Sequence, residues 1–462
     1  MELALLVDIG STYTKATVFN LTELKLEATA KAFTTIEEGI DQGLKEVFKK
    51  LIEQGVELEG IDYRLACSST AGGLKMVAVG LVPELTAEAA KRAALGAGAK
   101  VADVYSYELT AAEIDEIIGV EPDVILLAGG TDGGNQNIIL ENAMRLAESK
   151  LDTPVIVAGN KVVAKQVEEI LVAGNKTAYL TANVMPKLEE LNIEPARQKI
   201  RDVFLEQIIY AKGLDLVEDY LEGVIMPTPS AVMKAAELIS EGTAQEDGLG
   251  ELMVVDIGGA TTDIHSAAKG KPTKGGVNLR GLEEAYIKRT VEGDLGMRYS
   301  ASSLLKSVGE ENVLNFVEQM FQNELLDYID KVGEEVNYVP TEQQEKEFDL
   351  ALAKAATNAA VNRHVGRIET VYSPFGQQYV QYGKDLTKLN LIIGTGGVVV
   401  HSAQPAEILK EGLFSADEPQ ILAPMEPKLM LDQDYILSAI GLLAEIKPNQ
   451  ALQLAKIYLK AI

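Results

Sequence analysis

The sequence has a single cysteine, three histidines and no long apolar run. One cysteine excludes a disulfide framework, a cysteine-rich zinc site and an iron–sulfur cluster held by this chain alone. The three histidines, His265, His364 and His401, lack ligand spacing and predict no metal site. No apolar run reaches the ~18 residues of a membrane helix, and Met1–Val7 lacks the basic region of a signal peptide. We therefore expect a cytoplasmic protein without membrane contact.

Basic residues are also scarce relative to acidic ones. The 462-residue chain has 42 basic and 69 acidic residues and a formal net charge of −27. Such a surface repels nucleic acid and anionic membranes, so we expect neither as a partner. The chain is 47% hydrophobic, and at ~150 residues per domain its length predicts two or three domains.

The N-terminal segment reads as the start of a mixed sheet. Leu3–Asp8, Lys15–Asn20 and Lys25–Ala32 are short strand-like runs separated by polar turns. Glu37–Gln54 carries a helical apolar stripe, and Arg64–Ser68 is a further strand.

From Thr86 the pattern alternates between short apolar strands and helices, which predicts a parallel sheet covered on both faces. The expected helices are Ala87–Gly96, Ala111–Ile118, Asn137–Glu148 and Val162–Val172, and the expected strands are Lys100–Tyr105, Val124–Ala128, Val155–Val157 and Thr177–Leu180. Pro186–Leu221 has no strand signal and is expected to be helical.

A second sheet begins after Gly242–Gly250. Leu252–Asp256 and Thr262–Ala267 are expected strands, and Leu391–Ile393 is a third. The remaining segments are expected to be helical: Leu282–Phe348 with an interruption near Asn337–Pro340, Leu350–Arg367, Tyr435–Ile446 and Ala451–Leu459.

One motif occurs twice. Asp8-Ile-Gly-Ser-Thr-Tyr-Thr-Lys15 and Asp256-Ile-Gly-Gly-Ala-Thr-Thr-Asp263 share a strand, an acid, a glycine turn and a returning strand. Their separation is too long for a solenoid and suits duplicated domains. We expect a first lobe at 1–225, with an α/β extension at about 86–190 and helices at about 186–221. The second lobe would span 226–462, with a helical insertion at about 282–367 and C-terminal helices.

These glycine turns have the chemistry of phosphate loops. Glycine lets backbone N–H groups approach an anion, and neighbouring hydroxyl and ammonium groups add donors. The candidate phosphate-binding residues are Gly10, Ser11, Thr12, Thr14 and Lys15 in the first turn and Gly258, Gly259, Thr261 and Thr262 in the second. At the strand ends, Asp8 and Asp256 are candidate catalytic residues and candidate ligands of a hydrated Mg²⁺.

A third turn, Gly394-Thr395-Gly396-Gly397, follows a strand and could lie flat against an adenosine. No segment has the spacing of a Walker A loop or of a dinucleotide fingerprint, so the nucleotide hypothesis depends on the paired hairpins.

The order of these motifs resembles the actin, Hsp70 and sugar kinase superfamily. Asp8–Lys15 and Asp256–Asp263 look like its two phosphate loops and Gly394–Gly397 like its adenosine loop, while Pro227–Leu238 is similar to its connecting helix. The resemblance implies an α/β fold of two ribonuclease-H-like lobes with a nucleotide cleft between them, and ATP and Mg²⁺ as cofactors.

Within that superfamily the chain looks similar to the accessory proteins encoded beside glutamate mutase, called MutL or GlmL, which share only a name with the mismatch-repair protein. The matching stretches are Leu5–Lys15, Ala66–Thr86, Leu126–Asn135, Val255–His265 and Arg289–Arg298. The resemblance implies an ATPase that acts as a reactivating chaperone for an adenosylcobalamin-dependent mutase or aminomutase, with or without a small second subunit.

Other functions remain open at this stage. A small-molecule kinase of the same superfamily would need a catalytic base that we cannot assign. The activators of 2-hydroxyacyl-CoA dehydratases have a very similar first loop, but they share an iron–sulfur cluster between subunits through two cysteines each, which Cys67 alone cannot provide. No polymer interface of a filament-forming actin relative is readable. The glycine-rich segment Ile125–Asn135 is either a tight strand-to-helix connection or a further ligand loop.

Overall fold

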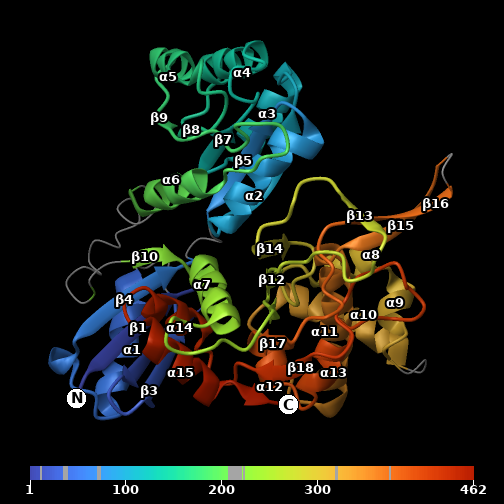
Figure 1. Cartoon of the computed structure of the whole chain (residues 1–462). Helices are drawn as coiled ribbons and strands as arrows, with labels where there is room; N and C mark the ends of the chain where they lie inside the picture. Colours follow the sequence, from blue (N-terminus) through green and yellow to red (C-terminus); the bar gives the residue numbers. More distant parts are fainter. Residues whose placement is uncertain are drawn as a thin grey trace. The chain divides into compact units, whose positions relative to one another are not determined.

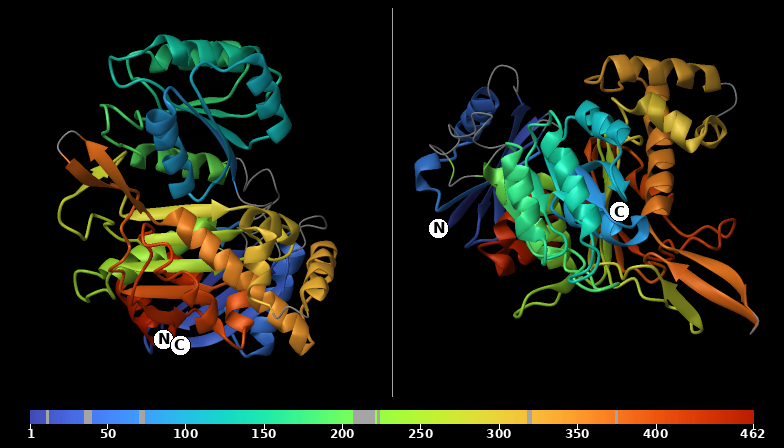
Figure 2. Two further views of the ribbon diagram at one scale, coloured as in Figure 1. Left: turned by 90° about the vertical axis from the view of Figure 1, so that its right-hand side faces the viewer. Right: turned by 90° about the horizontal axis from the view of Figure 1, so that it is seen from above.

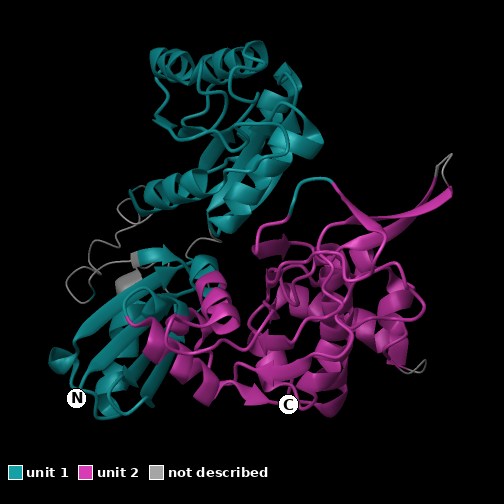
Figure 3. Cartoon of the chain, viewed as in Figure 1, with its two compact units in different colours: residues 1–232, 281–283, 441–446 teal, residues 233–280, 284–440, 447–462 magenta. Residues whose placement is uncertain are grey.

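The computed structural model describes residues 1–10, 13–34, 40–69, 74–206, 221, 224–317, 321–373 and 376–462. It divides into two compact units (Figure 3). Unit 1 comprises Met1–Val232, Gly281–Glu283 and Gly441–Ile446, and unit 2 comprises Met233–Arg280, Glu284–Ile440 and Lys447–Ile462. We describe each unit by itself. No helix within the described ranges is long and apolar enough to cross a membrane.

Unit 1 begins with a five-stranded sheet in the order β10-β4-β1-β2-β3 (Figure 1). The first three strands form an antiparallel meander, and β4 and β10 lie parallel to β1. The strands are β1 (Leu3–Ile9), β2 (Tyr13–Asn20), β3 (Lys25–Phe33), β4 (Tyr63–Ser68) and β10 (Val224–Pro227). Helix α1 (Ile40–Glu53) packs on this sheet, burying the apolar stripe expected for its segment, of which Leu44, Val47 and Leu51 are buried.

A second sheet of unit 1 is fully parallel, in the order β6-β5-β7-β8-β9. Its strands are β5 (Lys75–Gly80), β6 (Lys100–Ser106), β7 (Val124–Leu127), β8 (Val155–Val157) and β9 (Ala178–Leu180). Its helices are α2 (Glu88–Gly96), which continues a π-helical turn at Pro83–Ala87, and α3 (Ala111–Val120), α4 (Asn137–Glu148), α5 (Ala164–Ala173) and α6 (Glu194–Phe204).

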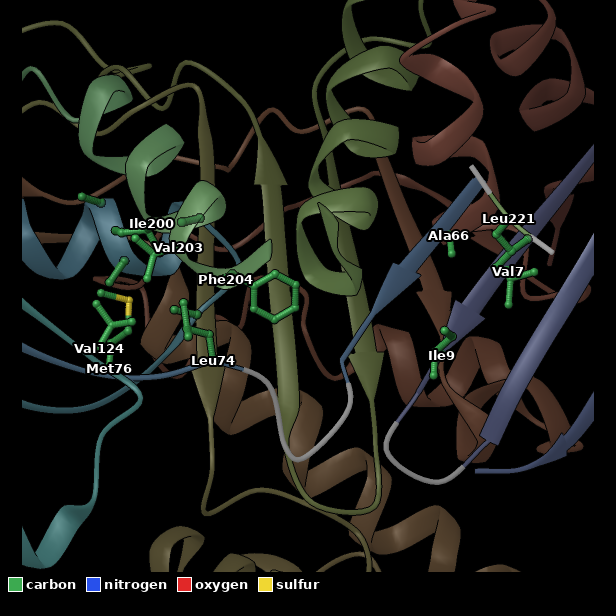
Figure 4. Packing of buried hydrophobic residues seen from close by; sticks show 14 of the residues in the cluster. Val7, Ile9, Ala66, Leu74, Met76, Val124, Ile200, Val203, Phe204 and Leu221 are labelled. Carbon is green, nitrogen blue, oxygen red and sulfur yellow. The ribbon is translucent and has the colours of Figure 1, made fainter. Parts of the chain in front are cut away.

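Both faces of this sheet are covered, as the continuous apolar strands predict. In β5, Met76 belongs to the core beneath α2 and α6, while its neighbour Val77 belongs to the core beneath α3, α4 and α5. Figure 4 shows Phe204 and Val203 of α6 beside Leu74 and Met76. The α/β prediction for this segment is confirmed, although strand β5 was not anticipated.

Unit 2 repeats the first sheet with one more strand, in the order β14-β12-β11-β17-β18-β19. β12 is antiparallel to both β11 and β14, β17 and β18 lie parallel to β11, and β19 is antiparallel to β18. The strands are β11 (Leu252–Ile257), β12 (Thr262–Ala267), β14 (Ile287–Glu292), β17 (Leu391–Thr395), β18 (Lys428–Leu431) and β19 (Lys460–Ala461). The meander followed by two parallel strands is the ribonuclease-H-like order, so the duplicated α/β fold is confirmed.

Several helices of unit 2 pack around the long helix α11 (Gln343–His364), which lies against the sheet. They are α8 (Ala301–Val308), α9 (Glu310–Leu314), α10 (Gln322–Glu334), α12 (Gly397–His401) and α13 (Pro405–Lys410). Helix α15 (Pro448–Tyr458) also belongs to unit 2. Two further helices, α7 (Thr228–Glu241) and α14 (Leu437–Ala444), each contribute residues to both units.

The expectation that Leu282–Phe348 is helical was wrong at β14. This strand lies at the edge of its sheet and is largely half-buried, so it has polar residues at most positions and no apolar alternation. Arg289 of β14 is buried, and its guanidinium forms an ion pair with Asp263 of β12 at 2.8 Å. Strands β18 and β19 also went unpredicted, as did β13 (Val277–Arg280), β15 (Arg367–Ser373) and β16 (Gly376–Tyr382), which form a third sheet in the order β13-β16-β15.

Two buried histidines of unit 2 predict a pH-dependent stability. Burial and the Arg289 charge lower the pKa of His265 to about 3, and burial with the Lys288 and Lys384 charges lowers the pKa of His364 well below its usual range. Below pH ~6.5 these histidines therefore bind protons in the unfolded chain but stay neutral in the folded chain. The free energy of unfolding falls as the pH is lowered toward 3. We expect a loss of about 1 to 2 kcal/mol per histidine between pH 7 and pH 5, measured by urea unfolding.

The His265→Asn substitution should flatten this dependence, because asparagine does not titrate. The same change at the exposed His401 is the matched control. An equal loss of stability on acidification in wild type and His265→Asn would contradict the assignment.

Candidate functional site

The first glycine hairpin lies between β1 and β2. The Gly10 amide donates to the Tyr13 carbonyl oxygen at 3.0 Å, which closes a tight turn. A Cβ at Gly10 would lie 2.6 Å from that oxygen, so a side chain would force the turn open. Two of the candidate phosphate-binding residues, Ser11 and Thr12, lie outside the described residues.

Asp8 has two partners that the sequence analysis did not place at the site. The Thr228 hydroxyl donates to Asp8 Oδ1 at 2.6 Å, and the Cys67 Sγ lies 3.6 Å from the same oxygen. All three residues lie where the parallel strands β1, β4 and β10 end, and Thr228 begins helix α7. The structure thus brings Asp8 together with the start of the segment singled out as a connecting helix. A threonine directly after an apolar strand was the available signal.

Cys67 is a buried thiol at this site. Burial and the negative charge of Asp8 raise its pKa well above the usual range, so the sulfur stays protonated and can donate to Asp8. The side chain is completely buried, as that of a small core residue is, and it contacts Asp8 as well.

The other candidates of the first hairpin differ in their exposure. Lys15 is half-buried and lies directly opposite Asp8 in the β1–β2 ladder, so the two side chains share one face of the sheet. Thr14 is fully buried, and its hydroxyl lies 3.0 Å from the Thr34 hydroxyl. Thr14 therefore supports the hairpin from inside.

The second hairpin has the same closure. The Gly258 amide donates to the Thr261 carbonyl oxygen at 2.9 Å. Thr262 is buried, as Thr14 is, and its hydroxyl donates to the Leu295 carbonyl oxygen at 2.7 Å. The Thr261 hydroxyl is half-exposed and donates to Asp263 at 3.0 Å.

A loop that follows β14 braces this hairpin from outside. The amides of Met297 and Arg298 donate to the carbonyl oxygens of Gly258 and Gly259, at 3.1 and 2.8 Å. The Arg298 guanidinium forms a two-pronged ion pair with the buried Asp349 of α11, at 3.0 and 2.8 Å. The stretch Glu292–Arg298 thus fixes the position of the second phosphate-loop candidate.

The third glycine turn lies beside the second hairpin. Gly394 and Thr395 are the last residues of β17, Gly396 forms the turn with φ +89°, and Gly397 begins α12. A Cβ at Gly396 would lie 2.3 Å from the Ile257 carbonyl oxygen at the end of β11. Thr395 lies beside Asp256 in the parallel β11–β17 ladder, so unit 2 assembles two of its predicted motifs at one edge of the sheet.

Two residues that the sequence analysis missed complete this edge. Asp432 accepts the Thr395 hydroxyl at 3.0 Å and the Ile436 amide at 2.8 Å, so it ties the turn to the start of α14. Burial, followed by the charges of Asp432 and Asp256, raises the pKa of Tyr435 to about 12, so this phenol stays protonated at neutral pH. An aspartate shortly before an apolar helix was the readable signal for Asp432.

Among the residues that the structure describes, no group of three or more histidine, cysteine or acidic side chains could hold a metal ion by itself. An aspartate near the strand end before each hairpin, Asp8 or Asp256, suits Mg²⁺, which is held in nucleotide sites by one or two carboxylates together with water and phosphate oxygens. Asp8 and Asp256 therefore fit a nucleotide-bound Mg²⁺ and do not fit a cage made of protein ligands alone.

Comparisons with known proteins agree on the family. The family model described as MutL protein matches residues 4–459. A protein from Clostridium tetanomorphum named Protein MutL is 52% identical over 470 residues, covering 99% of both chains.

Solved structures give distant likenesses. Component A of the (R)-2-hydroxyglutaryl-CoA dehydratase of Acidaminococcus fermentans has a TM-score of 0.33 at 10% identity and covers 99% of each chain. A xylulose kinase from Lactobacillus acidophilus has a TM-score of 0.37 at 10% identity, covering 100% of this chain and 93% of its own. The family assignment comes from the match along nearly the whole sequence: the chain belongs to the MutL protein family, the one that the motif resemblance indicated.

Proposed function

We propose that this protein binds and hydrolyses ATP with Mg²⁺ and acts as a reactivating accessory protein for an adenosylcobalamin-dependent mutase or aminomutase of the glutamate mutase type. The observation that supports this proposal is that the same structural motif occurs in both units. Each unit has a ribonuclease-H-like sheet in which the first strand has an aspartate as its penultimate residue and turns back through a glycine-closed hairpin.

In this proposal the two hairpins hold the phosphates. The backbone N–H groups of the turns and the ammonium of Lys15 donate to the β- and γ-phosphate oxygens. Asp8 and Asp256 hold the hydration shell of the metal and orient the attacking water. When bound, Mg²⁺ neutralises charge on the phosphate oxygens.

The nucleoside would lie against the third turn. Gly396 and Gly397 present backbone without side chains, which allows a flat ring to approach. Near them, Tyr435 supplies a protonated phenol as a hydrogen-bond donor: its hydroxyl lies 3.9 Å from where a Cβ of Gly397 would be.

The accessory role follows from family membership together with the duplicated architecture. A nucleotide that contacts residues of both units stabilises whichever arrangement of the units permits both sets of contacts, and loss of the γ-phosphate removes part of that stabilisation. A mutase bound to the protein would experience this change and release its damaged cobalamin.

Isothermal titration with ATP, with and without Mg²⁺, tests the proposed nucleotide site. We expect binding that requires Mg²⁺ and is lost on substitution of Asp256. Phosphate release is then measured with and without purified glutamate mutase. Absence of both binding and hydrolysis under all these conditions would refute the proposal.

The Thr228 hydroxyl is expected to position the Asp8 carboxylate. A hydrogen bond to a charged group contributes about 1.5 to 3 kcal/mol, so Thr228→Val should lower ATP turnover roughly 10- to 100-fold. Thr228→Ser keeps the hydroxyl and should retain most of the activity. Equal activity in the valine variant and wild type would show that the 2.6 Å contact has no role in turnover.

A further inference from the structure

Unit 2 contains a small sheet that has no counterpart in the first sheet of unit 1. β13 is inserted between β12 and β14, and β15 and β16 between α11 and β17. We call residues 277–280, 367–373 and 376–382 the arm. The β15–β16 hairpin extends away from the rest of unit 2 in Figures 1 and 2. The ribonuclease-H-like sheet does not need these strands, so their presence calls for another explanation.

The base of the arm is firmly held. Gln381 is completely buried, and its amide donates to the carbonyl oxygens of Gly270 and Gly383 at 2.9 and 2.8 Å. The Ile368 amide donates to the Gln420 carbonyl oxygen at 2.8 Å. The arm is therefore presented by a fixed base and is not a loose loop.

One face of the arm displays exposed tyrosine and leucine side chains. Tyr372 pairs with Gln377 and Val277 with Tyr379, and residues two apart on a strand share a face. This register puts Tyr372, Tyr379 and Leu279 on one face, where they are 80%, 44% and 41% exposed. Tyrosines on a rigid strand lose little conformational entropy on binding and anchor many protein interfaces.

The opposite face and the loop before β13 are basic. Arg280 and Arg367 flank Tyr382, with the Arg367 guanidinium 5.6 Å from the ring centroid. Lys269, Lys271 and Lys274 of the preceding loop are exposed. Across residues 269–280 and the arm the only acidic residue is Glu369, in a chain whose net charge is −27. Positive charge is thus concentrated on the face of the arm opposite Tyr372 and Tyr379 and in the loop that precedes β13.

We propose that the arm is a docking surface for a protein partner that presents an acidic patch, with the tyrosines as anchors. Resting on the proposed function, the partner is the cobalamin enzyme that the protein serves. Two copies of a chain with net charge −27 repel each other, which disfavours self-association through the arm. The net negative charge also disfavours nucleic acid as the partner, because proteins bind nucleic acid largely by neutralising its phosphates.

The test is biolayer interferometry with immobilised, purified glutamate mutase and the full chain. The wild type should bind, and its affinity should fall as NaCl rises from 50 to 300 mM. A Tyr372→Ser and Tyr379→Ser double variant should bind at least tenfold more weakly, as should Arg280→Glu. Tyr107→Ser and Lys49→Glu, at exposed positions outside the arm, are matched controls that should bind like wild type.

Separate measurements distinguish this proposal from the nucleotide site. ATP binding measured by calorimetry should be unchanged in every arm variant. If wild type did not bind ATP, the proposed function would be refuted and the docking proposal would still be tested by mutase binding. Unaltered mutase binding by the arm variants, or no mutase binding by wild type that binds ATP, would overturn the docking proposal. So would a dimer in ultracentrifugation that the arm variants abolish, or arm-dependent binding of an oligonucleotide.

Discussion

Asp256→Asn is expected to lower ATP turnover by at least about 100-fold while leaving the fold intact. Asparagine keeps the shape of the side chain and removes the charge that would hold the water shell of the metal and orient the attacking water. Asp256 is the penultimate residue of β11, beside Thr395, and contributes to the raised pKa of Tyr435, so its charge faces the third turn as well as the hairpin. Phosphate release, followed over a range of ATP concentrations in the presence of Mg²⁺, measures the effect.

The same change at Asp8 should be equally severe, since the first hairpin has the same construction. Asp417→Asn removes a charge at an exposed position of unit 2 and is the matched control. Circular dichroism of all three variants should coincide with wild type. Wild-type turnover in both Asp8→Asn and Asp256→Asn would eliminate the assignment of these residues.

Gly396→Ala is expected to destabilise unit 2 by at least about 3 kcal/mol. Two costs add at this position. The backbone has φ +89°, which L-residues with a side chain rarely adopt, and the new Cβ would lie 2.3 Å from the Ile257 carbonyl oxygen. Since that oxygen belongs to the strand that carries Asp256, relief of the clash would also displace the candidate site and weaken ATP binding.

Gly276→Ala separates the two costs. Gly276 also has a positive φ, +77°, but a Cβ there would meet nothing within 4 Å. We expect Gly276→Ala to lower the free energy of unfolding only by the backbone conformational cost, about 1 to 2 kcal/mol. Hydrogen exchange of peptides covering β11 and β17 reports the local stability of the sheet. Similar protection in the two alanine variants would show that the close approach at Gly396 is not required.

The sequence predicted the secondary structure best where a pattern is local. The strand–acid–glycine motif appears at Asp8 and again at Asp256, and the structure closes both turns with the same amide-to-carbonyl hydrogen bond. The helix Asn137–Glu148 and the strand Val155–Val157 were predicted with their observed bounds, because apolar periodicity reports directly on burial. Edge strands such as β14 were not predicted, because a half-buried strand can be polar at most positions and then lacks apolar alternation.

The supporting residues of the candidate site could not be predicted in the same way. Thr228 contacts Asp8 from 220 positions away, and Arg298 pairs with Asp349 across 51. Neither pair produces a periodic pattern in the sequence. Judged from its neighbours alone, each of these residues could equally lie in a turn or at an exposed position. Buried polar partners become visible only when the strands and helices that carry them are assembled.

By itself the sequence determined the family, the duplicated α/β architecture and the positions of three glycine turns, because these depend on local backbone requirements and on apolar patterning. Tertiary structure alone decided that the turn at Gly396 lies against the end of β11, that Thr228 reaches Asp8, and that Leu279, Tyr372 and Tyr379 share an exposed face. The physical reason is that these contacts join segments whose encounter is set by strand order and register, which no local pattern encodes.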